Sequence, residues 1–358
     1  MTIHLVINTV IVKQYFHFKT NMLSLYKLSE FSNYKRRQRF MARHKIVLIG
    51  SGYVGSAFAH AIVAKGLVDE MAIIDIDEDK AKADVWDLNH ATPFGDNFVN
   101  VHVGQYEDFK DADIVVICAS AKLAKGETRL KLLEDNVDIF VPMIQRIVDS
   151  GFDGYFVLPS NPVDIMSYVV KRVSNFPKNK IIGSGTSLDT ARFQFFLSRE
   201  FDVAPNQVYA PIIGEHGDSQ VAVWSHAQIA GEPVLDLLPS NTNLEAFKTS
   251  ISNRTTQIGY DIYVRKGTTN FGISLSLVRI VEAILFNKNI IMNVSSYVEG
   301  EYGLSDVYIG VPTVINRNGA DRIIELALSK EELSQLHHSA DIILDYQRQA
   351  DAIIDQMC

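Results

Sequence analysis

From Lys45 onward, short runs of apolar residues alternate with longer stretches of helical periodicity. The apolar runs cover residues 46–49, 72–75, 114–118, 155–158 and 181–182. Helices are predicted between them at about 53–65, 79–88 and 130–149, and after Pro162. The runs do not alternate apolar with polar residues, which is typical of parallel strands covered on both faces. The pattern predicts a doubly wound α/β fold.

The pattern changes after about residue 186. A long helix is predicted at 187–201, strands within 206–235, helices at about 243–264 and 269–286, strands near 290–316 and a last helix from about 329. No internal repeat and no low-complexity linker separates the two parts. We therefore expect an α+β domain at 186–358 that packs closely on the doubly wound domain at 41–185.

Residues 1–40 differ in composition from the rest of the chain. They hold seven Lys or Arg and one acid, which leaves 27 basic and 41 acidic residues and a formal charge of −14 from Met41 onward. The apolar stretch 5–12 is too short to cross a bilayer, and no small-residue cleavage pattern follows it. The scarcity of acids would suit a transit peptide. Because Met41 closely precedes the first predicted strand, we instead expect 1–40 to be an extension outside the fold.

Charge and cysteine usage limit the class of protein. An acidic body disfavours nucleic acid and anionic membranes as partners. Cys118 ends an apolar run, Cys358 is the last residue, and no CxxC spacing occurs. Two such cysteines suit a reducing cytoplasm, without a disulfide framework or a structural metal.

A glycine pattern, Gly-Ser-Gly-Tyr-Val-Gly at 50–55, joins the first predicted strand to the first predicted helix. Gly50 allows a tight turn, Gly52 lets the backbone approach a pyrophosphate, and Gly55 lets helix and strand pack closely. The pattern recurs by chance, so it predicts a dinucleotide site only in company with other residues.

Asp75 is the acid that such a site requires. It follows the next predicted strand, where a carboxylate accepts hydrogen bonds from an adenosine ribose. Capping of the helix that starts near Asp79 is the alternative role. Ile76 and Asp77 come next, with no Arg to hold a 2′-phosphate. This predicts NAD rather than NADP as cofactor.

Three further residues supply an acid, a cation and a proton-transfer group. Asp189 and Arg192 are three positions apart and share one face of the helix predicted at 187–201; an ion pair within that helix, with Asp189 as its N-cap, is the alternative. His216 lies between Glu215 and Gly217 in a predicted loop, where an imidazole can transfer a proton near neutral pH. With the glycine pattern, these residues predict hydride transfer to or from a nicotinamide.

Several motifs together carry a resemblance to a known family. They lie at 49–55, 87–90 (Asp-Leu-Asn-His), 126–130 (Gly-Glu-Thr-Arg-Leu), 160–164 (Ser-Asn-Pro-Val-Asp), 188–192 (Leu-Asp-Thr-Ala-Arg), 214–218 (Gly-Glu-His-Gly-Asp), 266–269 (Lys-Gly-Thr-Thr) and 306–312. From about 45 to 350 the chain resembles the L-lactate dehydrogenases of the lactate/malate dehydrogenase superfamily. It is most similar to the bacterial enzymes, including their relatives the L-2-hydroxyisocaproate dehydrogenases. The resemblance implies a Rossmann NAD-binding domain, an α+β catalytic domain and a homotetramer.

Carried over by position, the resemblance assigns the chemistry to four residues. His216 would donate the proton to the 2-oxo group in reduction and accept it in oxidation, and Asp189 would orient its imidazole and favour the charged form. Arg192 would bind the substrate carboxylate through its two-pronged guanidinium. Arg129 would polarise the carbonyl when its loop closes; by itself it is typical of a solvated residue at a helix start.

The resemblance also assigns residues around the cofactor and substrate. Asn161 would contact both the nicotinamide and the substrate oxygen, and Thr269 would line the pocket; a turn before Pro162 and a helix N-cap are the alternatives. The remaining cofactor-side positions are Val54, Lys80, Tyr106 and Ala121, beside Gly50, Gly52, Gly55 and Asp75. No metal is implied.

At three positions the chain departs from the family pattern. Leu123 stands where lactate dehydrogenases carry Gln and malate dehydrogenases carry Arg, which removes the cation for a second carboxylate and offers an apolar wall. A neutral substitution in a surface loop is the alternative. Gln194 and Tyr209 stand where activated bacterial relatives hold fructose 1,6-bisphosphate with Arg and His. We therefore expect no activation by this sugar phosphate.

The expected activity is that of a cytoplasmic, NAD-dependent L-2-hydroxy acid dehydrogenase. Its 2-oxo acid would be pyruvate or a larger aliphatic one such as 2-oxoisocaproate. Malate dehydrogenase is the nearest alternative, opposed by Leu123. A dinucleotide-binding protein without catalysis is another, opposed by the complete set of catalytic residue types. An NAD-and-metal glycosidase would need a Cys–His metal pair that the sequence does not supply.

Overall fold

The computed structural model describes residues 43–121 and 129–357, without the side chains of Arg129 and Leu130. Nine strands form the main sheet in the order β14-β13-β12-β6-β5-β4-β1-β2-β3. Its parallel strands are β1 (Lys45–Ile49), β2 (Glu70–Ile74), β3 (Asn100–Val103), β4 (Ile114–Ile117), β5 (Tyr155–Leu158) and β6 (Ile181–Gly183). The strand order reverses between β1 and β4, and a ligand is expected at the carboxyl ends of strands beside such a reversal.

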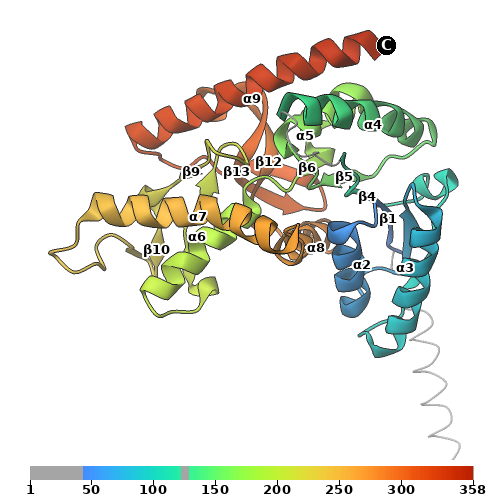
Figure 1. Ribbon diagram of the computed structural model, residues 1–358, viewed down its shortest axis with the longest axis horizontal. Helices are drawn as coiled ribbons and strands as arrows, with labels where there is room; N and C mark the ends of the chain where they lie inside the picture. The colour runs from blue at the N-terminus through green and yellow to red at the C-terminus, as the bar shows by residue number, and fades with distance from the viewer. Residues whose placement is uncertain (1–42, 122–128, 358) are drawn as a thin grey trace, which may run out of the picture. The chain divides into compact units, whose positions relative to one another are not determined.

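Helices cover both faces of this parallel part (Figure 1). They are α2 (Tyr53–Lys65), α3 (Glu78–Ala91), α4 (Arg129–Asp149), α5 (Val163–Ser174), α8 (Phe271–Leu285) and α9 (Lys330–Met357). Val47 and Ile49 of β1 belong to a core shared with α4, α5 and α9. Ile46 and Leu48 belong to a second core shared with α2, α3 and α8. Because both sets of alternate residues are buried, the strand is an unbroken apolar run, and the predicted doubly wound fold is confirmed.

The strands that follow residue 290 extend the same sheet in antiparallel fashion. They are β12 (Ile290–Glu299), β13 (Ser305–Asn316) and β14 (Gly319–Ile323). β12 joins the parallel part where Ser295 pairs with Gly183 of β6. The sheet therefore continues across the predicted division at 185, and the residue boundaries of the two domains stay a prediction.

A smaller layer carries the remaining elements. It contains α6 (Ser187–Glu200), α7 (Leu244–Lys266) and the short strands β7 (Val208–Tyr209), β8 (Ile212–Ile213), β9 (Val221–Ala222), β10 (Gln228–Ile229) and β11 (Glu232–Pro233). Phe193 and Leu197 of α6 pack with Ile212 and Val208 in a third core. This layer fixes α6, and with it Asp189 and Arg192, next to the β8–β9 loop that carries His216.

The sequence pattern missed the two edge strands of the main sheet: β14, which lies beyond the strands expected near 290–316, and β3. The residues of β3, Asn-Val-His-Val at 100–103, alternate polar with apolar ones, because an edge strand has neighbours on one side only. Within residues 43–121 and 129–357, no single helix is long and apolar enough to span a membrane; α7 and α8, which meet at a 117° bend, pass that test only as a pair.

Candidate active site

The glycine loop lies between β1 and α2, at the carboxyl end of β1. Gly50 has φ +89°, and a Cβ there would lie 2.6 Å from the Ala119 backbone nitrogen. A Cβ on Gly55 would lie 1.9 Å from the Gly50 carbonyl oxygen, so neither position admits a side chain. A Cβ on Gly52 would meet nothing within 4 Å. The loop is thus tight on the protein side and open where a pyrophosphate would approach, which fits a dinucleotide.

Asp75 is tied to this loop. Its Oδ2 accepts a hydrogen bond from the Ser51 backbone N–H at 2.7 Å, and its Oδ1 accepts one from the Asp77 N–H at 3.0 Å. Asp77, not Asp75, is the N-cap of α3, where it accepts from the Lys80 N–H at 3.0 Å. The capping alternative for Asp75 is therefore wrong. The Lys80 ammonium contacts the Ser51 carbonyl, so Lys80 lies beside the loop, and its cofactor contact stays a prediction.

Asp189 joins the two other groups that the sequence selected. Its Oδ2 is 2.6 Å from His216 Nδ1, and its Oδ1 accepts from Arg192 Nη1 at 2.9 Å. The intrahelical ion pair predicted as an alternative is therefore present, but it coexists with the histidine contact. Thr186 is the N-cap of α6, so the capping alternative for Asp189 is wrong. With Nδ1 facing the carboxylate, Nε2 is the imidazole nitrogen left for a substrate.

Electrostatics favour the charged form of this histidine. The negative charge of Asp189 raises the pKa of His216 above its ordinary value, burial opposes this, and Asp164 adds to it. Burial acts to raise the pKa of Asp189, but the charge of His216 and the hydrogen bonds from His216 and Arg192 outweigh it and leave that pKa low. The contact therefore favours the charged form of both partners, an aspartate beside an imidazolium.

Asp164 is a residue beside His216 to which the sequence reasoning assigned no role. Its side chain is 2% exposed, and its Oδ2 accepts from the His216 backbone N–H at 3.0 Å. Its Oδ1 accepts from the Ser295 hydroxyl at 2.6 Å. Burial raises the pKa of Asp164 to about 6. The available signals were its place as the last residue of the Ser-Asn-Pro-Val-Asp motif and in the first turn of the helix that follows Pro162.

Asn136 is a second residue that went unnoticed. It is fully buried in α4, where its Oδ1 accepts from the Ala121 N–H at 2.7 Å and its Nδ2 donates to the Asn161 carbonyl at 2.8 Å. One amide therefore joins the chain segments that leave β4 and β5. Asn136 thereby holds together Ala121 and Asn161, the two residues that the resemblance assigns to the cofactor side.

The other residues assigned to the site take no part in these contacts or lie outside the described residues. Thr269 precedes Asn270, the N-cap of α8, so its capping alternative is wrong. Leu123 lies outside the described residues, as does the side chain of Arg129. Their proposed contacts with substrate stay predictions. Val54 lies in the first turn of α2, half-buried behind the glycine loop.

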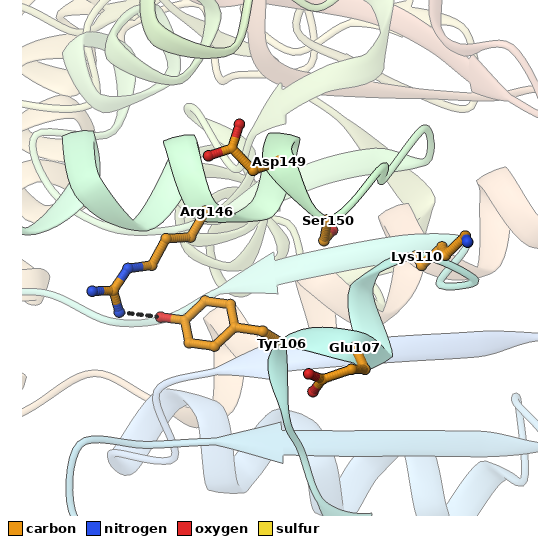
Figure 2. Close-up of a pocket in the computed structure, with 6 residues that line it drawn as sticks. All are labelled: Tyr106, Glu107, Lys110, Arg146, Asp149 and Ser150. Carbon is orange, nitrogen blue, oxygen red and sulfur yellow. Dashed lines mark hydrogen bonds between the residues drawn. The ribbon is translucent and has the colours of Figure 1, made fainter.

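Tyr106 lines a cavity of about 410 Å³ between the end of α4 and the short helix η2 (Tyr106–Phe109). Figure 2 shows its hydroxyl meeting Arg146, whose Nη1 donates to it at 3.2 Å. The other lining residues are Glu107, Lys110, Asp149 and Ser150. Because none of the catalytic candidates lines it, this cavity is not the site of proton transfer. The cofactor contact assigned to Tyr106 stays a prediction.

One group of side chains in the described part of the chain has metal-ligand spacing: Glu70, His102 and Asp108. The Lys45 ammonium lies 3.3 Å from Glu70 Oε1 and 2.9 Å from Asp108 Oδ1. A cation of the protein therefore already occupies the space between these carboxylates. The group carries no argument for a metal.

Comparisons with known proteins agree with this geometry. Residues 44–183 match the family model of the lactate/malate dehydrogenase NAD binding domain, and residues 186–353 match that of the lactate/malate dehydrogenase alpha/beta C-terminal domain. An L-lactate dehydrogenase of Staphylococcus saprophyticus is 48% identical over 88% of this chain and 99% of its own. One of Bacillus pumilus is 48% identical over 84% and 96%.

Solved structures give the same result. The minor L-lactate dehydrogenase of Enterococcus mundtii, in its ligands-bound form, superimposes with a TM-score of 0.82 and 36% identity, over 87% of this chain and 98% of its own. A lactate dehydrogenase from a deep-sea metagenome library gives 0.83 and 38%, over 87% and 100%.

Proposed function

This chain belongs to the L-lactate dehydrogenases of the lactate/malate dehydrogenase family and is an NAD-dependent oxidoreductase acting on a CH–OH group, and from that premise we propose how its residues interconvert a 2-oxo acid and the L-2-hydroxy acid. The observation that carries the proposal is the 2.6 Å contact between His216 Nδ1 and Asp189 Oδ2. It fixes the imidazole so that its other nitrogen can meet a substrate oxygen.

In the reducing direction, a bound NADH would supply the hydride for the carbonyl carbon. His216 gives its Nε2 proton to the carbonyl oxygen, so the alcohol forms as the imidazole becomes neutral. Asp189 stabilises the imidazolium before transfer and keeps the ring oriented after it. In oxidation the neutral imidazole takes the proton back.

Arg192 binds the substrate carboxylate. Its Nη1 is committed to Asp189 at 2.9 Å, which orients the planar guanidinium and leaves its outer donors for two carboxylate oxygens. Arg129 polarises the carbonyl, Asn161 orients substrate against nicotinamide, and Thr269 lines the pocket. Gly50, Gly52, Gly55 and Asp75 hold the dinucleotide, with Val54, Lys80, Tyr106 and Ala121 beside it.

The preferred 2-oxo acid depends on Leu123. An apolar side chain at that position favours an aliphatic substrate, and a methylene that fills such a pocket contributes about 1–3 kcal/mol, or about 10–200-fold in discrimination. We expect 2-oxoisocaproate to be used at least comparably to pyruvate, and oxaloacetate poorly. A panel of these acids, followed by NADH absorbance, tests this. Far better turnover of pyruvate than of every longer acid would make Leu123 a silent substitution.

Two variants separate the alternatives. Leu123→Gln should move preference toward pyruvate, because it restores a hydrogen-bonding group. Leu123→Arg should move it toward oxaloacetate, because it supplies a cation for the second carboxylate. A protein that binds NADH and turns over none of the acids would be the non-catalytic dinucleotide-binding alternative.

We further propose a homotetramer in the cytoplasm. Large apolar side chains are exposed on α7 and α8, which suits burial against other copies of the chain. They are Tyr260 (63%), Tyr263 (56%), Val264 (61%), Phe271 (69%) and Leu275 (56%). Light scattering of the full chain gives the mass directly, and a monomer at micromolar concentration would contradict the proposal.

A further inference from the structure

Three consecutive backbone N–H groups fasten the turn that carries His216, each to a different element. The Gly214 N–H donates to the Gly310 carbonyl of β13 at 2.9 Å. The Glu215 N–H donates to Ser339 Oγ of α9 at 2.7 Å, and the His216 N–H donates to Asp164 of α5. The partners are far from the turn in sequence, so three distant elements of the fold hold its backbone.

Ser339 makes the shortest of these three hydrogen bonds. Its side chain is fully buried in α9, which Figure 1 shows beside β9 and β13. A Cβ on Gly214, where φ is +92°, would lie 2.8 Å from Ser339 Oγ. The turn and α9 therefore approach each other as closely as a glycine permits.

The hydrogens around Ser339 can be assigned. Ser219 Oγ lies 2.5 Å from the Glu215 Oε2 carboxylate oxygen. A carboxylate oxygen can only accept, so the Ser219 hydroxyl donates its one hydrogen to Glu215. Ser339 and Ser219 Oγ are 3.0 Å apart, so Ser339 must be the donor between them. The bonds run from the Glu215 N–H through both hydroxyls and back to the Glu215 carboxylate. Each bond in such a chain polarises the next.

We propose that Ser339 is a positioning residue for His216, and that the C-terminal helix α9 is through it part of the catalytic apparatus. The inference rests on the proposed role of His216 in proton transfer. The ring closed by Ser339 and Ser219 ties residues 215 and 219 together and holds the backbone on either side of His216. Its Nε2 is thereby aimed at the substrate oxygen, where a displacement of about 1 Å costs about 100-fold in rate.

The acid–base behaviour of His216 reports whether this positioning is lost. The groups that face it are Asp189 and Arg192 from α6 and Asp164 from α5, with Glu215 in its own turn. A looser turn lengthens the 2.6 Å contact with Asp189, which is the main cause of the raised pKa of His216. The pKa of His216 then falls, and the alkaline limb of the pH profile for 2-oxo acid reduction moves to lower pH.

The test compares Ser339→Ala with Ser174→Ala in the full chain. Ser174 is a matched control, because it is nearly buried at the end of α5 and accepts a backbone N–H from Phe176 at 3.2 Å, away from His216. Ser339→Ala should lower kcat/KM for pyruvate at least about tenfold, shift the alkaline limb and leave NADH affinity unchanged. Ser174→Ala should do none of these.

Ser219→Ala opens the same ring but leaves the Glu215 N–H bond to Ser339 in place, so it should fall between wild type and Ser339→Ala and carries the test if that variant is insoluble. The His216 imidazole, titrated by NMR, gives a readout besides turnover. A wild type that reduces no 2-oxo acid would refute the proposed function. An active wild type whose Ser339→Ala and Ser219→Ala variants keep its kcat/KM and its His216 titration would refute the positioning role.

Discussion

Gly259→Ala should weaken substrate binding while it stabilises the protein. Gly259 lies inside α7, where glycine is less favourable than alanine by about 1 kcal/mol. A Cβ at this position would lie 3.2 Å from both Nη1 and Nη2 of Arg192. Alanine therefore stabilises the helix but crowds the Arg192 guanidinium. The substitution should raise the free energy of unfolding and weaken substrate binding.

The magnitudes follow from these contacts. A Cβ at 3.2 Å displaces the guanidinium by a few tenths of an ångström, against its 2.9 Å bond to Asp189. A hydrogen bond to a charged group contributes about 1.5–3 kcal/mol, and losing about 1 kcal/mol of it raises KM about fivefold. The gain in helix propensity should raise the Tm by about 2 °C. His216 is untouched, so kcat should change less than about twofold.

Steady-state kinetics with pyruvate and a thermal melt provide both numbers. Asn253→Ala is the matched control, because Asn253 is exposed on the same helix and the change also improves helix propensity. The control should raise the Tm without moving KM. If Gly259→Ala raises the Tm and leaves KM unchanged, Arg192 does not need the clearance and our reasoning about this contact is wrong.

Three further predictions concern Asp164, the N-terminal extension and the effector. Burial raises the pKa of Asp164 to about 6 from 3.8, so the native state binds a proton that the unfolded state releases, and the unfolding free energy should fall by about 2 kcal/mol as pH rises from about 4 to about 6. Denaturant unfolding of Asp164→Asn at both pH values should lack this contribution; an unchanged pH dependence would contradict it. Deleting residues 1–40 should leave solubility and activity intact, since every motif lies beyond them, whereas an inactive truncated chain would make the extension part of the fold. Fructose 1,6-bisphosphate should leave the half-saturating pyruvate concentration unchanged, because Gln194 and Tyr209 offer a phosphate no positive charge; a large decrease would overturn this.

The parallel sheet could be predicted because its strands are buried on both faces. Alternate residues of β1 enter different cores, which leaves a run of apolar letters in the sequence. β3 was not predicted from the sequence, because the polar Asn100 and His102 interrupt its apolar residues at the edge of the sheet. Antiparallel addition of β12 to β6 could not be predicted either, since it rests on the single pairing of Ser295 with Gly183.

The same reasoning explains which site residues were found. Asp189 and Arg192 share a helix face, and His216 has a setting among glycines, so each leaves a local signal. Asp164 stands in the Ser-Asn-Pro-Val-Asp motif, but its contact with the turn at 214–219, like that of Ser339, gives no sign in the sequence, because each hydrogen bond comes from a distant part of the chain. Only the fold brings an ordinary aspartate and an ordinary serine to the backbone of a histidine.

The most direct test of the account is the rate of NADH oxidation by the His216→Ala variant with pyruvate. We predict that kcat falls by several orders of magnitude while NADH still binds, as measured by nucleotide fluorescence, because the variant loses the proton donor and keeps the glycine loop and Asp75. Turnover close to that of the wild type would show that the proton comes from elsewhere, and would contradict the assignment of His216 and Asp189 as the catalytic pair.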